Sequence, residues 1–297
     1  MQNKTVVSKP SETAFYTALR RTLAHLKFSN NTFGPDYLAS IFLPAHFRFF
    51  LKFQKIRENT WNKMSTMMPG LTYYVIARTA FFDEQFLNAL KSKTPQIVLL
   101  GAGYDSRAYR FMNLNQETRI FELDSSPTQQ RKIKCLKKAK VEIPASVTFI
   151  PINFMQDNLL VELVKNGFHE QKATLFLWEG VSYYLDRQSV ISTLQNIKHC
   201  THDNNRVVMD YSIPITEEIL KTTYGAETFL NSMREFHENE KFLFAIKDEE
   251  IDEFLTQNHL RLIELLDNKM IEQKYLLDQT GMLIGKMTGN FRFVIAT

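Results

Sequence analysis

The stretch Gln96-Ile-Val-Leu-Leu-Gly-Ala-Gly-Tyr-Asp105 decides the fold of this chain. Its apolar, uncharged run up to Leu100 is typical of a strand buried in a parallel sheet, and the Gly-Ala-Gly that follows predicts a tight turn. Similar short runs recur at 119–123, 147–150, 173–178 and 206–211, and stretches with helical spacing separate them at about 126–140, 156–166 and 187–200. This alternation predicts βαβ units and an α/β fold around a parallel sheet with right-handed crossovers.

The regions outside this core do not show the same alternation of strands and helices. The N-terminal segment has apolar residues at helical spacing, and Ser11 is the expected N-cap of its first helix. No internal repeat, linker or domain boundary interrupts the chain, so a single domain is expected. Its predicted parts are an N-terminal helical region (1–93), a cofactor-binding core (94–211), a helical cover over the carboxyl edge of the sheet (212–246), and a C-terminal helix at 248–257 with strands at 260–265 and 291–296 (247–297).

The composition excludes several classes of protein. Of the 297 residues, 44% are hydrophobic and 24 are Phe, which is enough for a large core and too many for a disordered chain. The net charge is +4, and the densest basic run, Arg131 to Lys140, is interpreted as a solvated helix face rather than a nucleic-acid patch. With two cysteines, no apolar signal region and no long apolar window, we expect a cytoplasmic protein without nucleic-acid or membrane partners.

The loop after the first strand indicates an adenosine cofactor. Gly101 and Gly103 let the backbone approach a ligand, and Asp124 follows Gly101 by 23 residues, at the end of the second strand, where an acid can accept hydrogen bonds from both ribose hydroxyls. A dinucleotide would need a third glycine beside its pyrophosphate, but that position is Ser106 and the loop carries Asp105. S-adenosylmethionine has no phosphate and is cationic at its sulfonium and ammonium groups. The loop therefore favours S-adenosylmethionine, and a nicotinamide oxidoreductase remains the alternative.

Five motifs in order resemble one known family. They are Arg78–Asp83 (RTAFFD), the Gly-Ala-Gly loop continuing to Arg110, Phe121–Asp124 (FELD), Leu177–Leu185 (LWEGVSYYL) and Arg206–Tyr211 (RVVMDY), joined near the N-terminus by Ser11-x-Thr13-Ala14…Arg20 and Gly34–Ala39. Over nearly its whole length, the chain resembles the leucine carboxyl methyltransferase-like family, and within it the bacterial small-molecule O-methyltransferase branch. The resemblance implies a Rossmann-like class I methyltransferase sheet, mostly parallel with an antiparallel last strand, plus an N-terminal helical extension and a helical cover.

The same resemblance implies a cofactor site. Arg78 would pair with the methionine carboxylate of the cofactor, Gly101 and Gly103 would contact its methionyl part, and Glu179 would lie near its amino end or the transferred methyl. Asn153 departs from the family pattern, which has an aspartate beside the adenine. Its carbonyl can still accept from the adenine amino group, but an ionised acceptor is lost. The expected cofactor-binding residues are Arg78, Gly101, Ala102, Gly103, Asp105, Glu122, Asp124, Asn153, Phe154 and Glu179.

The acceptor side is less defined. Arg107, Tyr109 and Arg110, after the loop, would either recognise an acidic acceptor or pin the loop to the N-terminal helices. Arg107 and Tyr183 are the expected substrate-binding residues, Glu179 and Tyr184 the expected catalytic ones, and no metal site is expected.

A carboxylate acceptor is already ionised at neutral pH and needs no base. A hydroxyl acceptor would need one, and the candidates are Asp210 and Glu179. The sequence therefore predicts an S-adenosylmethionine-dependent O-methyltransferase acting on a carboxylate or hydroxyl of a small molecule or peptide. Because of Asn153, a catalytically silent cofactor-binding or interaction protein is a second alternative.

Overall fold

The computed structural model describes residues 10–28, 30, 32–200, 205–236 and 242–297 of the protein. A seven-stranded sheet in the order β3-β2-β1-β4-β5-β7-β6 forms its centre. The strands are β1 (Gln96–Leu100), β2 (Arg119–Asp124), β3 (Val147–Pro151), β4 (Thr174–Trp178), β5 (Arg206–Ser212), β6 (Leu262–Leu266) and β7 (Phe291–Ala296). Pairing is parallel from β3 to β5, and β7 is antiparallel to both β5 and β6. The predicted mostly parallel sheet with an antiparallel last strand is confirmed.

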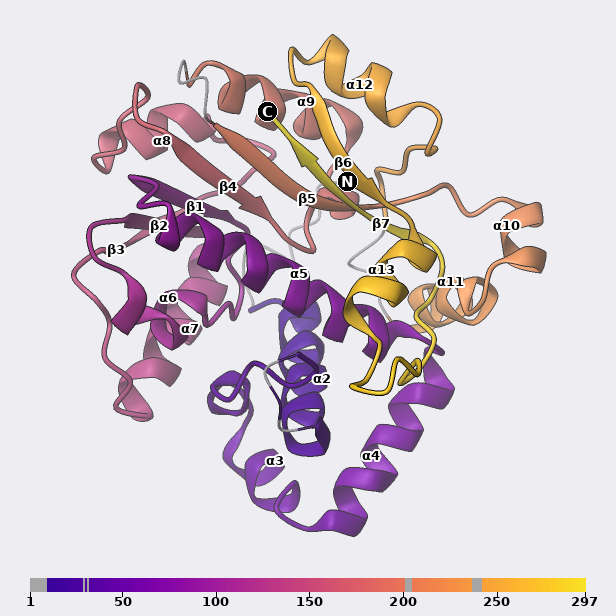
Figure 1. The fold of residues 1–297 in the computed structure, drawn as a ribbon. Helices are drawn as coiled ribbons and strands as arrows, with labels where there is room; N and C mark the ends of the chain where they lie inside the picture. The colour runs from indigo at the N-terminus through magenta and orange to yellow at the C-terminus, as the bar shows by residue number, and fades with distance from the viewer. Residues whose placement is uncertain (1–9, 29, 31, 201–204, 237–241) are drawn as a thin grey trace.

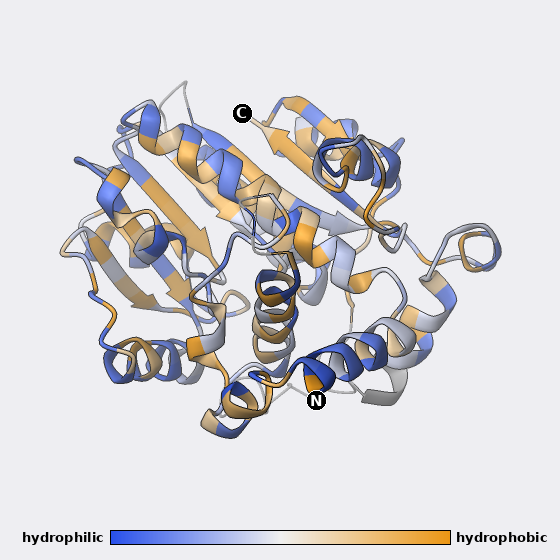
Figure 2. Ribbon diagram, turned by 60° about the horizontal axis from the view of Figure 1, so that its bottom comes forward, coloured by the Kyte–Doolittle hydropathy of each residue, from blue (hydrophilic) through white to orange (hydrophobic). Residues whose placement is uncertain are grey.

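Helices cover the two faces of this sheet. On one face lie α5 (Leu71–Lys91), α7 (Ser126–Lys138) and α13 (Asn268–Tyr275), and on the other lie α8 (Leu159–Lys165), α9 (Arg187–Lys198) and α12 (Ile251–Gln257). Successive β1 residues point to opposite faces, so Ile97 and Leu99 pack in the first layer and Val98 and Leu100 in the second. Figure 2 shows the resulting apolar strands inside a more hydrophilic outer surface.

The N-terminal helices gather at one end of the sheet, and α5 runs across its face (Figure 1). This group comprises α2 (Glu12–Phe28), the 3₁₀ helix η1 (Ala39–Phe42), α3 (Ala45–Phe50) and α4 (Gln54–Met67). Ser11 accepts a hydrogen bond from the Ala14 amide at 3.1 Å, as the predicted N-cap of α2 requires. The remaining short elements are α6 (Arg107–Arg110), η2 (Met112–Leu114), η3 (Ser182–Tyr184), α10 (Glu217–Thr222) and α11 (Ala226–Phe236).

The predicted helical cover at 212–246 contains two helices, α10 and α11, with 237–241 outside the described residues. The structure departs from the sequence predictions at α13 and at Lys132. Helix α13 was not predicted, although Asp267 caps it by accepting from the Met270 amide at 2.8 Å. Lys132 is an exception to the solvated face expected for 131–140, because it turns inward and its Nζ lies 2.6 Å from Oε2 of Glu122.

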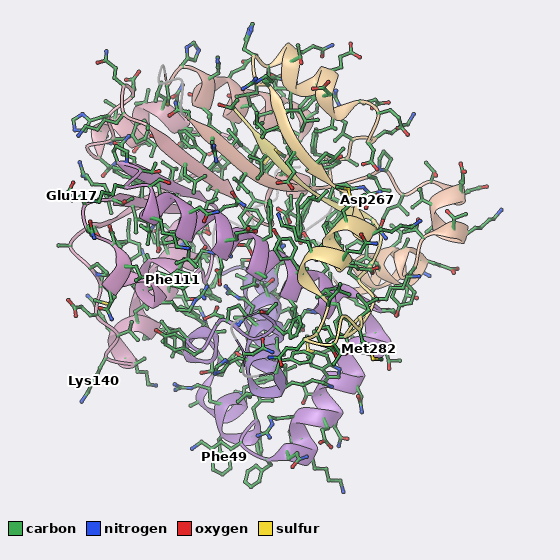
Figure 3. All side chains as sticks on the ribbon, viewed as in Figure 1. Phe49, Phe111, Glu117, Lys140, Asp267 and Met282 are labelled. Carbon is green, nitrogen blue, oxygen red and sulfur yellow. The ribbon has the colours of Figure 1, made fainter. Side chains whose placement is uncertain are left out.

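Exposed aromatic side chains gather at the end of α3 and just after it, at Phe49, Phe50 and Phe53. Phe49, at the end of α3, is 55% exposed, and Figure 3 shows it at the tip of the N-terminal helices, far from the sheet. No helix within the described part of the chain has the length and apolar character needed to cross a membrane.

Candidate functional site at the carboxyl edge of the sheet

The turn after β1 is fixed by the end of β2. Asp124 Oδ2 accepts from the Gly103 amide at 2.5 Å and Oδ1 accepts from the Ser125 amide at 2.6 Å. Gly101 has φ +70°, and a Cβ there would lie 2.3 Å from Cγ2 of Val181, so both backbone conformation and space require glycine. Burial raises the pKa of the Asp124 carboxyl. The carboxylate predicted to bind a ribose thus lies beside the predicted glycine loop.

Arginines and carboxylates form a continuous chain across this edge, which we call the edge network. Its members are Arg78, Arg107, Arg110, Asp83, Asp105, Glu179 and Asp210. Glu179 joins two arginines: Oε1 lies 3.0 Å from Arg78 Nε, and Oε2 lies 2.6 Å from Arg107 Nη1. Arg107 Nη1 also lies 2.5 Å from Asp105 Oδ2. The residues predicted from separate motifs, Arg78, Asp105 and Glu179, are therefore brought together.

Asp83 in α5 ties the loop to the N-terminal helices. Its carboxylate receives Arg107 Nε at 2.7 Å and both terminal nitrogens of Arg110 at 2.7 and 2.8 Å. Arg107 is only 1% exposed, and its side chain contacts the loop, α5 and Glu179 after β4. These contacts agree with the alternative in which Arg107 pins the loop to the N-terminal helices. The predicted role of Arg107 in binding an acceptor stays a prediction.

Asp210, near the end of β5, contacts the Arg78 side chain. Asp210 Oδ1 accepts from the Gly180 amide at 2.7 Å, and Oδ2 accepts from the Tyr74 hydroxyl and lies 3.3 Å from Arg78 Nη1. Arg78 also donates to the Tyr183 hydroxyl at 3.1 Å. Burial raises the pKa of Asp210. Asp210 is fully buried and already holds three partners, so it positions Arg78.

A cavity of about 60 Å³ opens beside Arg78 and Gly180, and we call it the aromatic cavity. Tyr74, Tyr183, Tyr184, Phe229, Phe242 and Phe291 form its aromatic wall, and Tyr183 lies 4.4 Å from Phe242 between ring centroids. Residues of α2 also line it. Both predicted acceptor-side tyrosines, Tyr183 and Tyr184, line it, whereas Arg107 does not.

Three predicted cofactor residues have other partners in the structure. Glu122 is 1% exposed and bonds Lys132 in α7 and the Tyr109 hydroxyl at 3.0 Å, so its carboxylate stabilises the layer between β2 and the helices. Asn153 Oδ1 accepts from the Met155 amide at 3.1 Å in a local turn. Phe154 is half-buried and packs against the second-layer core. No contact tests their predicted role in cofactor binding.

The sequence prediction assigned no role to several residues that the structure places here. Tyr74, Asp83 and Arg20 were missed; Tyr74 and Asp83 lie on α5, on either side of Arg78. Tyr74 precedes Arg78 by four residues and Asp83 follows it by five. On a helix, residues at these spacings lie on or beside the same face, so the sequence could have indicated that both lie near Arg78. No three His, Cys, Asp or Glu side chains gather as a metal site in the part of the chain that the structure describes.

Known proteins of similar sequence carry one kind of name. A "Putative S-adenosyl-L-methionine-dependent methyltransferase YktD" of Bacillus subtilis is 32% identical over 53% of this chain and 50% of its own length. A protein of the same description from Saccharopolyspora erythraea is 29% identical over 60% of each chain. The chain therefore matches only about half to three-fifths of the length of these curated relatives.

Solved structures share the fold at low sequence identity. A "putative methyltransferase" from Thermobifida fusca has a TM-score of 0.61 with 13% identity, over 97% of this chain and 95% of that one. A DUF574 family protein from Streptomyces avermitilis has a TM-score of 0.60 with 10% identity, over 81% and 90%. The family model described as "Leucine carboxyl methyltransferase" matches residues 14–198, which include the edge network up to Glu179 and most of the lining of the aromatic cavity. The chain belongs to the leucine carboxyl methyltransferase family.

Proposed function

We propose that the protein is an S-adenosylmethionine-dependent O-methyltransferase that methylates a carboxylate of a small molecule. The single observation that carries the choice of acceptor is the lining of the aromatic cavity. Among its described residues there is no His, Asp, Glu or Cys. The described lining therefore offers no ordinary general base to take a proton from the acceptor. An acceptor that is already ionised, such as a carboxylate, needs none.

The residues of the edge fit this cofactor. Asp124 accepts from two backbone amides and, on Oδ1, from the Ser125 hydroxyl at 3.2 Å, so Oδ2 is the oxygen with room for a ribose hydroxyl, and Gly101 at φ +70° makes the tight turn beside it. Arg78 Nε is buried and has no well-formed hydrogen bond, although Glu179 is at ion-pair distance. Arg78 would therefore hold the methionine carboxylate, with Glu179 near the ammonium group. Membership of the methyltransferase family supports the same assignment.

The tyrosines of the cavity serve to position the acceptor. Burial, followed by the charge of Asp210, raises the pKa of both Tyr74 and Tyr183 above the ordinary tyrosine value, so both hydroxyls stay protonated at neutral pH. When bound, S-adenosylmethionine supplies an electrophilic methyl group, which passes to the acceptor oxygen as the C–S bond breaks and the sulfur keeps the electron pair. Arg78 and the cavity walls then contribute alignment and exclusion of water.

One assay tests the proposal directly. The protein is incubated with S-adenosylmethionine and matched sets of carboxylic acids, phenols and aliphatic alcohols, and S-adenosylhomocysteine release is measured. We expect release with acids, and a methylated product that mild alkali hydrolyses, because an ester is base-labile and a methyl ether is not. Turnover of phenols alone would overturn the choice of acceptor. Failure to bind S-adenosylmethionine in a calorimetric titration would favour the catalytically silent alternative.

A further inference from the structure

One face of α2 is polar where it meets the aromatic cavity. Thr13, Tyr16, Thr17 and Arg20 all line the cavity, and their spacing of three, four and seven residues places them on one side of the helix. A helix face that packs on an aromatic wall is ordinarily apolar. Hydroxyls and a guanidinium line the same cavity as Phe229, Phe242 and Phe291, so the cavity offers a ligand polar as well as aromatic contacts.

Arg20 has no acidic partner in the described chain. Its side chain is 6% exposed, its Nε forms no hydrogen bond, and its one side-chain contact to an acceptor is Nη2 to Sδ of Met68 at 3.6 Å. The Thr13 hydroxyl on the same face also has no hydrogen-bond partner among the described residues. A thioether sulfur is a weak acceptor, and burying a cation without an anion is costly.

The other buried arginines of the described chain are all paired. Arg78, Arg107, Arg110 and Arg292 each lie within 3.3 Å of a carboxylate oxygen. Arg21, the next residue along α2 and also 6% exposed, lies 3.2 Å from Oδ2 of Asp36 and donates to the Tyr104 carbonyl at 2.8 Å. Each of the other buried arginines of the described chain therefore has an acid beside it, whereas Arg20, which lines the cavity, has none.

We propose that Arg20 binds a carboxylate of the methyl acceptor, and that the acceptor is a compact acid with an aromatic or other flat apolar body. The planar fork of a guanidinium matches a carboxylate with two parallel hydrogen bonds, and the ring walls suit a flat body. The proposal rests on the proposed methyl transfer and extends it to the class of substrate.

Two electrostatic features agree with this assignment. Burial lowers the pKa of Arg20 to about 10, so the side chain is still cationic at neutral pH and gains most from an incoming anion. Arg78 lines the same cavity but is already shared between Glu179 and Asp210. Because the proposed function assigns Arg78 to the methionine carboxylate of the cofactor, Arg20 is the cation of the described cavity lining that remains for the acceptor.

The binding experiment uses benzoate, phenylacetate and 3-phenylpropanoate, each with its neutral amide, in the presence of S-adenosylhomocysteine. We expect the wild type to bind at least one acid roughly 10–100-fold more tightly than its amide, the range of a charge-assisted hydrogen bond. In Arg20→Met that ratio falls to about one, and Arg20→Lys retains part of it. If no acid exceeds its amide, or if Arg20→Met keeps the preference, the proposal is overturned.

A stability measurement on the ligand-free protein separates binding from a structural role. Arg20→Met removes an unpaired buried charge, so its melting temperature should equal or exceed that of the wild type. Arg21→Met is the matched control; it removes the nearer of the two cations beside the buried Asp36, leaving Arg110 at 3.6 Å, and should lower the melting temperature by roughly 5–15 °C. A loss in Arg20→Met as large as that in Arg21→Met would show that Arg20 is structural and would contradict the proposal.

A third measurement keeps this inference apart from the proposed function. S-adenosylhomocysteine affinity is measured calorimetrically in the wild type and in Arg20→Met, and we expect agreement within about twofold, because Arg20 lies outside the edge network. A wild type that binds the acid but no cofactor would defeat the proposed methyl transfer and leave acid recognition by Arg20 standing. A large loss of cofactor affinity in Arg20→Met alone would place Arg20 in the cofactor site and overturn the inference.

Discussion

At the edge network, arginines and carboxylates are matched to one another before any ligand arrives, whereas the aromatic cavity beside it holds Arg20 against rings and a thioether. Both regions bury charge in the same small part of the molecule; Arg78 belongs to both, and it donates to the hydroxyl of Tyr183 in the cavity wall. A matched network keeps its side chains in one arrangement and so preorganises a site. Burying a cation without an anion beside it costs free energy, and a bound anion lowers that cost. The contrast suggests that the first region holds a constant ligand and the second selects a variable one.

The largest expected effect comes from breaking the edge network at its centre. Arg107→Met leaves Asp83, Asp105 and Glu179 without a shared cation in a buried site. Removing one member of a buried ion pair costs about 3–5 kcal/mol, and denaturant unfolding would measure it. The exposed pair of Lys165 and Glu162, 3.7 Å apart, is the control, and Lys165→Met should cost less than about 1 kcal/mol. Equal losses in the two variants would show that the network is not a stabilising unit.

The next effect concerns ligand affinity. Asp124→Asn keeps the shape of the side chain but removes the charge beside Gly103, and we expect S-adenosylhomocysteine binding to weaken roughly 10–100-fold. Calorimetric titration gives the affinity, with Asp252→Asn on the exposed face of α12 as the control. An Asp124→Asn protein that binds like the wild type would remove the ribose assignment and with it the idea of a constant ligand at this edge.

A third effect appears in the pH dependence of stability. Burial alone would raise the pKa of Asp105, but Arg107 outweighs it, and the pKa falls to about 2. Because the folded value lies below the unfolded value of about 4, the ionised side chain adds stability above about pH 4 and loses that contribution as the pH falls toward 2. The free-energy difference between wild type and Asp105→Asn should therefore be constant from about pH 7 to 5 and narrow below about pH 4. Urea unfolding across that range measures it, and a gap that widens on acidification would contradict the prediction.

The sequence predicted the sheet and the edge far better than the cavity. Strands β1 and β7 begin and end at the predicted residues, because a buried run flanked by turn residues marks both boundaries. Gly101, Asp124 and Glu179 follow strands, and the carboxyl ends of parallel strands necessarily meet at one edge. Local pattern and topology together were sufficient there.

The sequence pattern did not predict which side chains pair across elements that are far apart in the chain. Arg20 and Arg21 are adjacent on one helix and look alike in sequence, and only the packing of the segment around Asp36 decides which of them has an acid. Glu122 shows the same limit, since its neighbour Asp124 suggested a ligand role while Lys132 folds inward to pair with it. Helical spacing identifies faces, but the partner of a face depends on tertiary structure.

The smallest effect tests the residue that links the two regions. Tyr183→Phe removes the hydroxyl that Arg78 contacts at 3.1 Å and leaves the ring against Phe242 in place. We expect about 1 kcal/mol less stability, unchanged S-adenosylhomocysteine affinity and a severalfold higher KM for the carboxylic acid, because the ring and its neighbours still shape the cavity. Tyr109→Phe, whose hydroxyl bonds Glu122 at 3.0 Å away from the cavity, should lose similar stability without any change in KM. Should the two variants behave alike in KM, the aromatic cavity would not be where the acceptor binds, and the division between a matched edge and a selective cavity would fail.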